Sequence, residues 1–154
     1  MSLNQIIEFV ARWGHLWAAM TLIGGAIFLR QAVLPTAATL EESVRQTLMT
    51  GLRNRWRKVV MAGIGILLLT GLFNYVGLNL LPGATPRHKG DGLYHALMGI
   101  KILIGFAAFF LASVLAGRSP KFEGLRQQGA KWYGVLITLS LLAMTIGSFL
   151  KVRG

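Results

Sequence analysis

The sequence predicts an all-α membrane protein, a bundle of four transmembrane helices forming a single domain over residues 1–154. Hydrophobic residues make up 54% of the chain and charged residues only 14%, whereas a soluble domain has about 25% charged residues. The apolar residues are gathered into long runs rather than spread along one face of amphipathic helices. A lipid environment selects this pattern, because a helix that faces lipid needs no polar side.

Four stretches are long and apolar enough to cross a membrane, since a transmembrane helix needs about 20 mainly apolar residues. They lie at about residues 9–29, 59–80, 93–116 and 132–150. The second stretch ends before Leu81, Pro82 and Gly83, and the third ends at Gly117 and Pro120, which are residue types that commonly terminate helices. The connections are short except for the first.

The first connection, from Pro35 to Lys58, is long enough to contain a helix of its own. Thr39 and Glu42 have the spacing of a capping box. Apolar residues then recur at every fourth position and form one stripe, at Leu40, Val44, Leu48 and Leu52. Trp56 follows, a residue type that is enriched at membrane interfaces. We therefore predict an interfacial helix over about residues 39–52, lying at the membrane surface, with a plain turn as the alternative.

Lysine and arginine are unevenly distributed over the connections, and this predicts the orientation of the chain. The first and third connections share one side and hold ten of the 16 basic residues, whereas the other side holds five. Because cytoplasmic loops carry the excess of Lys and Arg, we expect both termini outside, in a bacterial inner membrane. The net charge of +11 suits anionic lipid headgroups. Nucleic-acid binding is excluded, because no soluble region remains to carry it.

Polar residues within the four stretches gather in the half of the membrane that we expect to face outward. His15 lies about 8–9 Å into the first stretch, and Lys101 lies about 9 Å deeper than His95 in the third. The other members of this group are Asn74, Tyr94, Thr145 and Ser148. Polar residues are unfavourable in lipid and commonly mark a functional site. One site near the outer surface is therefore expected.

Two histidines on the first and third stretches suit axial ligation of a haem held between helices. His15 and His95 are the candidate iron ligands, and either is otherwise an interfacial hydrogen-bonding residue. Arg12 is expected to hold a haem propionate, together with Arg87 or Lys89 in the outer loop. Asn74 is a further candidate contact. Lys101 is expected either to extend toward the surface, to meet an anion, or to complete the site as the second ligand; His88 lies in the loop and is a weaker candidate.

Copper is the competing cofactor. His95 and Met98 share a helix face at i, i+3 spacing, and both residue types bind copper. Most of the six methionines are expected to fill apolar space instead. The chain contains no cysteine, which excludes disulfides, thiolate metal sites and iron–sulfur clusters.

Two segments resemble known membrane proteins. The first is Arg12-Trp13-Gly14-His15-Leu16-Trp17-Ala18-Ala19, followed by Gly24-Gly25-Ala26-Ile27-Phe28 and Leu34-Pro35. The second runs from Tyr94-His95 through Lys101 to Phe109-Phe110-Leu111. These segments resemble helices of the CopD-like copper-resistance proteins and of the HemJ-type protoporphyrinogen oxidases. The resemblance implies a four-helix membrane protein in which His15 is a haem ligand and His95 or Lys101 completes the site.

Four functions follow from these observations. The first is a b-type haem protein that moves electrons at the outer face, with a quinone or another redox carrier as partner. The others are a copper-handling protein, a porphyrinogen oxidase that uses Lys101 or Arg12 to hold carboxylates, and a membrane assembly protein without a cofactor. If the protein is an enzyme, we expect an oxidoreductase. Glycine and alanine on the second stretch also leave a homodimer open.

Overall fold

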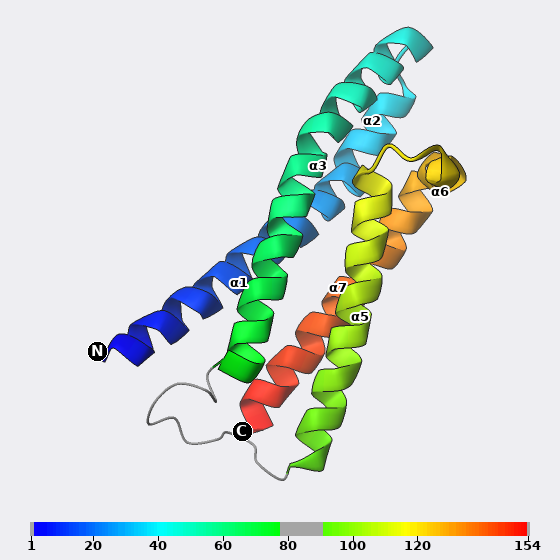
Figure 1. Ribbon diagram of the computed structural model, residues 1–154. Helices are drawn as coiled ribbons and strands as arrows, with labels where there is room; N and C mark the ends of the chain where they lie inside the picture. Colours follow the sequence, from blue (N-terminus) through cyan, green and yellow to red (C-terminus); the bar gives the residue numbers. More distant parts are fainter. Residues whose placement is uncertain (1, 78–90, 154) are drawn as a thin grey trace.

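The computed structural model describes residues 2–77 and 91–153, and within these ranges every regular element is a helix. The elements are α1 (Leu3–Phe28), η1 (Leu29–Val33), α2 (Leu34–Ala38), α3 (Glu42–Leu72), η2 (Phe73–Gly77), α5 (Gly92–Ala116), η3 (Pro120–Phe122), α6 (Glu123–Gln127) and α7 (Gly129–Arg153). Both chain termini lie at one end of the molecule, and the α2–α3 junction and α6 lie at the other (Figure 1). We call these the terminal end and the basic end.

Four helical segments in the described ranges are long and apolar enough to cross a membrane. They are Leu3–Ala38, Glu42–Val76, Gly92–Ala116 and Gly129–Val152. The predicted all-α fold and the multi-pass membrane architecture are thus confirmed. The third and fourth stretches match their predicted bounds within about three residues at each end. The predicted end of the second stretch, at residues 78–80, lies outside the described residues.

The first segment begins earlier than its apolar run and continues past it. Ser2 and Gln5 form a capping box in which each side chain accepts a hydrogen bond from the other's backbone N–H, so the helix begins at Leu3. Near its other end, Pro35 cannot donate a backbone hydrogen bond, and its ring would collide with the carbonyl four residues earlier. The π-helical turn Leu29–Val33 widens the helix there and lets it continue through the proline to Ala38.

The predicted interfacial segment is helical but is not a separate element, because Glu42 to Leu72 form one unbroken helix. No proline interrupts this stretch, and its arginines are good helix formers. The Thr39–Glu42 capping box is also absent: Thr39 donates to the carbonyl of Thr36, and Glu41 occupies the N-cap position. Leu52 packs against the protein core rather than against lipid headgroups. The separate helix predicted over residues 39–52 is therefore corrected to an extension of the helix that forms the second span.

The four long helices form a ring in which α1 and α5 are both flanked by α3 and α7, so that α1 and α5 are diagonal to each other. The buried core lies toward the basic end and is built mainly from Ala26, Leu29, Val60, Ile64, Leu111, Leu115 and Leu136. Glycines bring α1 and α3 together there: a Cβ on Gly25 would lie 2.0 Å from the Trp56 ring, and one on Gly63 would lie 2.9 Å from Leu22.

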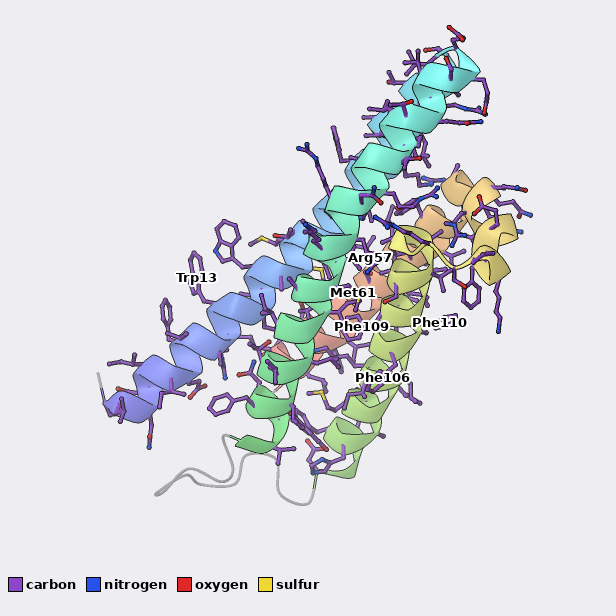
Figure 2. All side chains as sticks on the ribbon, turned by 45° about the horizontal axis from the view of Figure 1, so that its top comes forward. Trp13, Arg57, Met61, Phe106, Phe109 and Phe110 are labelled. Carbon is purple, nitrogen blue, oxygen red and sulfur yellow. The ribbon has the colours of Figure 1, made fainter. Side chains whose placement is uncertain are left out.

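Toward the terminal end the helices are less closely packed. The first turns of α1 diverge from the other three long helices (Figure 1). Phe9, Trp13 and Trp17 form a ladder on the outer face of α1, with ring centroids 6.4 and 6.0 Å apart, and each ring is about half exposed. Trp13 projects away from the bundle (Figure 2). Such a face is suited to lipid contact.

Candidate functional site

The polar residues predicted to share a site come together in the terminal half of the bundle, around the end of the second span. His15 on α1 is partly buried, and its Nδ1 lies 2.9 Å from the hydroxyl of Thr70 on α3. The imidazole edge rests against the backbone of Gly71, where a Cβ would lie only 3.4 Å from Cε1. A side chain at position 71 would therefore crowd the ring. Thr70 and Gly71 together fix the position of the His15 imidazole.

The hydrogen bonds of Thr70 determine which nitrogen of His15 is left available. The Thr70 hydroxyl donates its hydrogen to the carbonyl of Ile66, at 2.6 Å, so it can only accept from His15. The neutral imidazole then carries its proton on Nδ1. The Leu67 carbonyl is a further acceptor at this ring, which agrees with a proton directed toward α3. The lone pair of Nε2 remains free for a metal or for a hydrogen-bond donor.

Asn74 lies one turn beyond Thr70, in the π-helical turn Phe73–Gly77. Its Oδ1 is buried and has no hydrogen-bond partner among the described residues. A buried acceptor without a donor is unfavourable by about 1–3 kcal/mol, so native structures rarely keep one without a reason. Single π-helical turns are also frequent at functional sites. Asn74 is therefore available to a ligand with a donor group.

Lys101 reaches the same region from the diagonal helix α5. Its ammonium packs against Gly147 on α7, where a Cβ would lie 3.0 Å from Nζ, and it lies within electrostatic range of His15. Among the described residues Lys101 forms no hydrogen bond and no ion pair. A membrane-embedded cation without a counter-ion is unfavourable and marks a place where an anion can bind. Gly147 supplies the space for the Lys101 head group.

His95 lies at the start of α5 and is exposed. Its Nδ1 is 3.1 Å from the hydroxyl of Tyr75, and the rings of Tyr75 and Tyr94 meet the imidazole edge-to-face at 6.2 and 5.5 Å. His15 and His95 thus hydrogen-bond to two hydroxyls of one short segment, Thr70 and Tyr75. The structure holds both imidazoles through Nδ1 from the end of the second span.

The remaining predicted residues are placed less centrally. Arg12 is exposed and forms an ion pair with Glu8, 2.6 Å away on the same helix. Met98 lies partly buried on α5, one turn from His95. Arg87, His88 and Lys89 lie outside the described residues. Within the described ranges no group of three or more His, Asp or Glu side chains is arranged to hold a metal ion.

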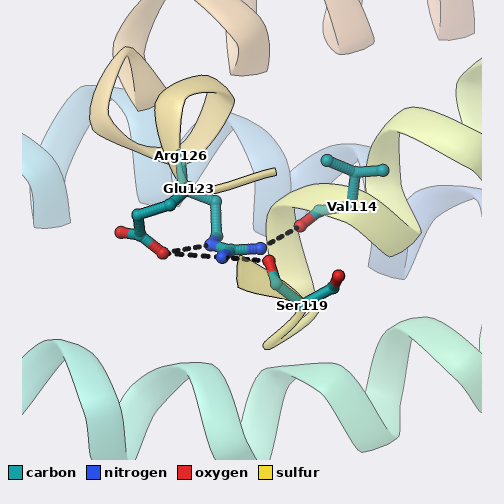
Figure 3. Close-up of polar contacts among 4 residues, drawn as sticks. All are labelled: Val114, Ser119, Glu123 and Arg126. Atoms are coloured by element: carbon teal, nitrogen blue, oxygen red, sulfur yellow. Dashed lines mark hydrogen bonds and ion pairs between the residues drawn. The ribbon is translucent and has the colours of Figure 1, made fainter. Parts of the chain in front are cut away.

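A second polar cluster lies at the basic end and is of a different kind. The buried guanidinium of Arg126 donates to the carbonyls of Val114 and Ser119 at 3.5 and 2.5 Å, and to the Glu123 carboxylate at 2.6 and 3.1 Å (Figure 3). These hydrogen bonds lower the pKa of the Glu123 carboxyl below its ordinary value of 4.5. Arg126 thereby ties the end of α5 to α6.

Several residues of both clusters carry no signal in the sequence alone. Thr70 and Tyr75 are single polar residues near the end of an apolar run, and their importance follows only from the histidines that they contact. Gly147 is one of 19 glycines. In the sequence Arg126 does not differ from the other basic loop residues, because the carbonyls that it contacts are known only from the structure.

Comparison with protein-family models, with curated proteins and with solved structures gives no match for this chain. The class that the structure itself defines is a multi-pass, four-helix membrane protein with a polar cluster inside one half of the bundle. The resemblance to CopD-like and HemJ-type proteins stays a prediction.

The donor set of the terminal half fits a haem by its chemistry. His15 offers an unprotonated Nε2 from an imidazole that is held through Nδ1, which is the arrangement usual for metal-ligating histidines. Lys101 has no counter-ion among the described residues and therefore suits a ligand that carries carboxylates. Asn74 Oδ1, an acceptor without a donor in the same ranges, suits a donor group of the ligand instead.

Proposed function

We propose that this protein binds one b-type haem in the terminal half of its bundle and takes part in electron transfer. The observation that carries the proposal is the hydrogen-bond direction at His15, since Thr70 can only accept and so leaves Nε2 as a ligand inside a membrane bundle. Lys101, which has no counter-ion among the described residues and lies within electrostatic range of His15, supports an anionic macrocycle as the ligand.

Each residue of the cluster then has a distinct role. His15 would be one ligand of the haem iron, and His95 or Lys101 would be the other. Lys101 and Asn74 would otherwise contact a propionate, and Arg12 remains a candidate for the second propionate. Thr70 holds the His15 ring in the orientation that ligation needs. A bound haem would supply one-electron redox chemistry, with a potential set by these ligands and by burial.

The orientation and partners belong to the same proposal. The basic end carries the excess of Lys and Arg, so we place it in the cytoplasm of a bacterial cell and the haem site near the outer face of the inner membrane. A membrane quinone or another redox carrier would exchange electrons there.

The visible spectrum of the purified protein tests the proposal. The protein is prepared in mild detergent from haem-replete cells, and spectra are recorded oxidised and dithionite-reduced, with iron and copper measured on the same sample. We expect a sharp reduced α band, about one iron per chain, and loss of both in His15→Ala. A colourless preparation without iron would overturn the proposal, and copper in that sample would favour the copper-handling function.

A matched pair of variants separates ligation from folding. Thr70 and Thr21 both donate to the carbonyl four residues earlier, but only Thr70 contacts a histidine. Thr70→Val is expected to shift the reduction potential or to lower haem retention, whereas Thr21→Val should behave as the wild type. If the two variants have the same reduction potential and haem retention, Thr70 and His15 do not belong to the haem site.

Porphyrinogen oxidation is the second candidate function, and Lys101 is the observation that favours it. A cation without a counter-ion, close to the membrane-embedded His15, suits the carboxylates of a tetrapyrrole substrate as well as those of a cofactor. Oxidation of added protoporphyrinogen by the purified protein, lost in Lys101→Met, would support this function. Protein that retains haem but shows no such activity would exclude it.

A further inference from the structure

A small cavity lies at the basic end, away from the histidines. It has a volume of about 40 Å³ and is lined by residues of six elements, among them Leu34, Leu52, Arg53, Trp56, Arg126 and Tyr133. A water molecule needs about 10–15 Å³ of such space, so the cavity has room for about three waters or for one group of similar size. Its walls are mainly apolar and aromatic, with two guanidinium groups and one phenol.

The two arginines of this cavity differ in what they already bind. Arg126 is occupied by the carbonyls of Val114 and Ser119 and by the Glu123 carboxylate (Figure 3). Arg53 is partly buried and forms no hydrogen bond or ion pair with any described residue. Its charge acts on Tyr133 and on Glu123 from a distance. Arg53 is therefore the group in this cavity that still lacks an acceptor.

The charge balance around the cavity is positive. Arg53 and Arg126 contribute two positive charges, and Glu123 contributes the one negative charge that acts on both of them. Arg118 lies beside this group and donates to Asn54, the residue after Arg53. Arg57 and Lys58 on α3 are exposed and add to the positive potential. An anion with several acceptor oxygens would satisfy Arg53 and the Tyr133 hydroxyl together.

The position of the cavity indicates where that anion comes from. Arg53 and Trp56 lie where the apolar part of α3 gives way to its basic extension. Because Trp and basic residues gather at membrane interfaces, we expect the boundary between membrane and water at this point. The cavity has room for a phosphate group but not for the chains attached to it. At this depth a phosphate is carried by the headgroups of the adjoining lipid leaflet, whose acyl chains would remain in the bilayer.

We propose that this cavity binds the headgroup phosphate of one anionic phospholipid, with Arg53 as its principal partner and Tyr133 as a second donor. The bound lipid joins α3 to α7 at the basic end, where α5 and α6 are already joined by Arg126. The proposal is independent of whether the terminal half holds a haem.

Lipid-dependent thermal stability tests the site. Wild-type protein in detergent receives phosphatidylglycerol, phosphatidylcholine or millimolar inorganic phosphate, and the unfolding midpoint and the number of retained lipids by native mass spectrometry are measured. We expect phosphatidylglycerol to raise the midpoint and one lipid to be retained. Arg53→Gln is expected to weaken this effect about tenfold in lipid concentration, because one charge-assisted contact is lost.

Arg55→Gln is the matched control, since Arg55 is exposed on the same helix and its loss changes the net charge equally. It should respond to phosphatidylglycerol as the wild type does. Tyr133→Phe removes only a hydroxyl and gives a second, milder variant should Arg53→Gln fold poorly; it should weaken the response by a smaller factor. Equal responses of Arg53→Gln and Arg55→Gln would overturn the proposal. Protection by phosphatidylcholine or by inorganic phosphate alone would also overturn the anionic lipid as its occupant.

Discussion

The two ends of this bundle each contain a cation, buried at Arg126 and partly buried at Lys101, and the two cations differ in what surrounds them. Arg126 at the basic end donates to two backbone carbonyls and to Glu123. Lys101 in the terminal half has no hydrogen bond or ion pair among the described residues and lies within electrostatic range of His15. In the same half, Asn74 Oδ1 is a buried acceptor without a donor among these residues. Satisfied polar groups hold a fold together, whereas unsatisfied ones are stable only if something else completes them. The comparison separates a structural cluster from a candidate site.

Replacing Arg126 should produce the largest loss of stability. Arg126→Ala leaves the Val114 and Ser119 carbonyls without their donor and Glu123 without its partner. We expect the free energy of unfolding to fall by about 1–3 kcal/mol for each carbonyl that loses its buried donor. Thermal unfolding in detergent measures this, with Arg118→Gln as the exposed control. A midpoint close to that of the wild type would show that the basic-end cluster does not stabilise the fold.

Replacing Lys101 should raise the stability of the protein rather than lower it. Lys101→Met keeps a long side chain against Gly147 and removes a charge that has no partner in the described structure. The ligand-free protein should gain about 2–3 kcal/mol of stability, since that is the penalty for Lys in the middle of a span. Thermal unfolding of haem-free protein is the measurement, and Lys131→Met, beside Trp132, is the control. A destabilised Lys101→Met would mean that Lys101 is a structural residue like Arg126.

A substitution at the contact between α1 and α3 tests whether the basic half of the bundle is rigid. A Cβ at position 25 would lie 2.0 Å from the Trp56 ring, and this ring sits within a packed core. Gly25→Ala should therefore lower stability by about 1–3 kcal/mol through overpacking. Gly24→Ala is the control, because its Cβ would meet nothing within 4 Å. Similar unfolding midpoints for the two variants would contradict the predicted rigidity of this contact.

The smallest expected change in stability is the one that depends on the protonation of Glu123. Hydrogen bonds from Arg126 lower the pKa of its carboxyl in the folded state, so the ion pair stabilises the protein above the ordinary value of 4.5. This contribution is lost as the pH falls through the lowered folded-state pKa. The difference in unfolding midpoint between wild type and Glu123→Gln should thus be small at neutral pH and disappear in acid. A difference that grows on acidification would contradict the assignment.

The sequence predicts the fold class and the bounds of the third and fourth spans closely, because lipid imposes long apolar runs that are visible without a structure. It fails at residues 39–52, since an apolar stripe does not reveal whether its helix stops or continues into the next span, and here Glu42–Leu72 form one helix. Within the stripe only Leu52 packs against the core, whereas Leu40, Val44 and Leu48 are exposed. The sequence places His15, Asn74 and Lys101 in one half of the bundle from their depth in the predicted spans alone. It cannot find Thr70 or Gly147, because their roles depend on helix rotation and on contacts between distant residues.

The most direct test of the central claim is the ratio of haem to protein in His15→Ala and Arg126→Lys, purified side by side with the wild type and unfolded thermally without added ligand. We expect about one haem per chain in the wild type. His15→Ala should contain no haem yet retain the unfolding midpoint of the haem-free wild type, and Arg126→Lys should keep its haem but unfold at a lower temperature. Haem absent from the wild type, or lost equally in both variants, would contradict the assignment of the site to the terminal half.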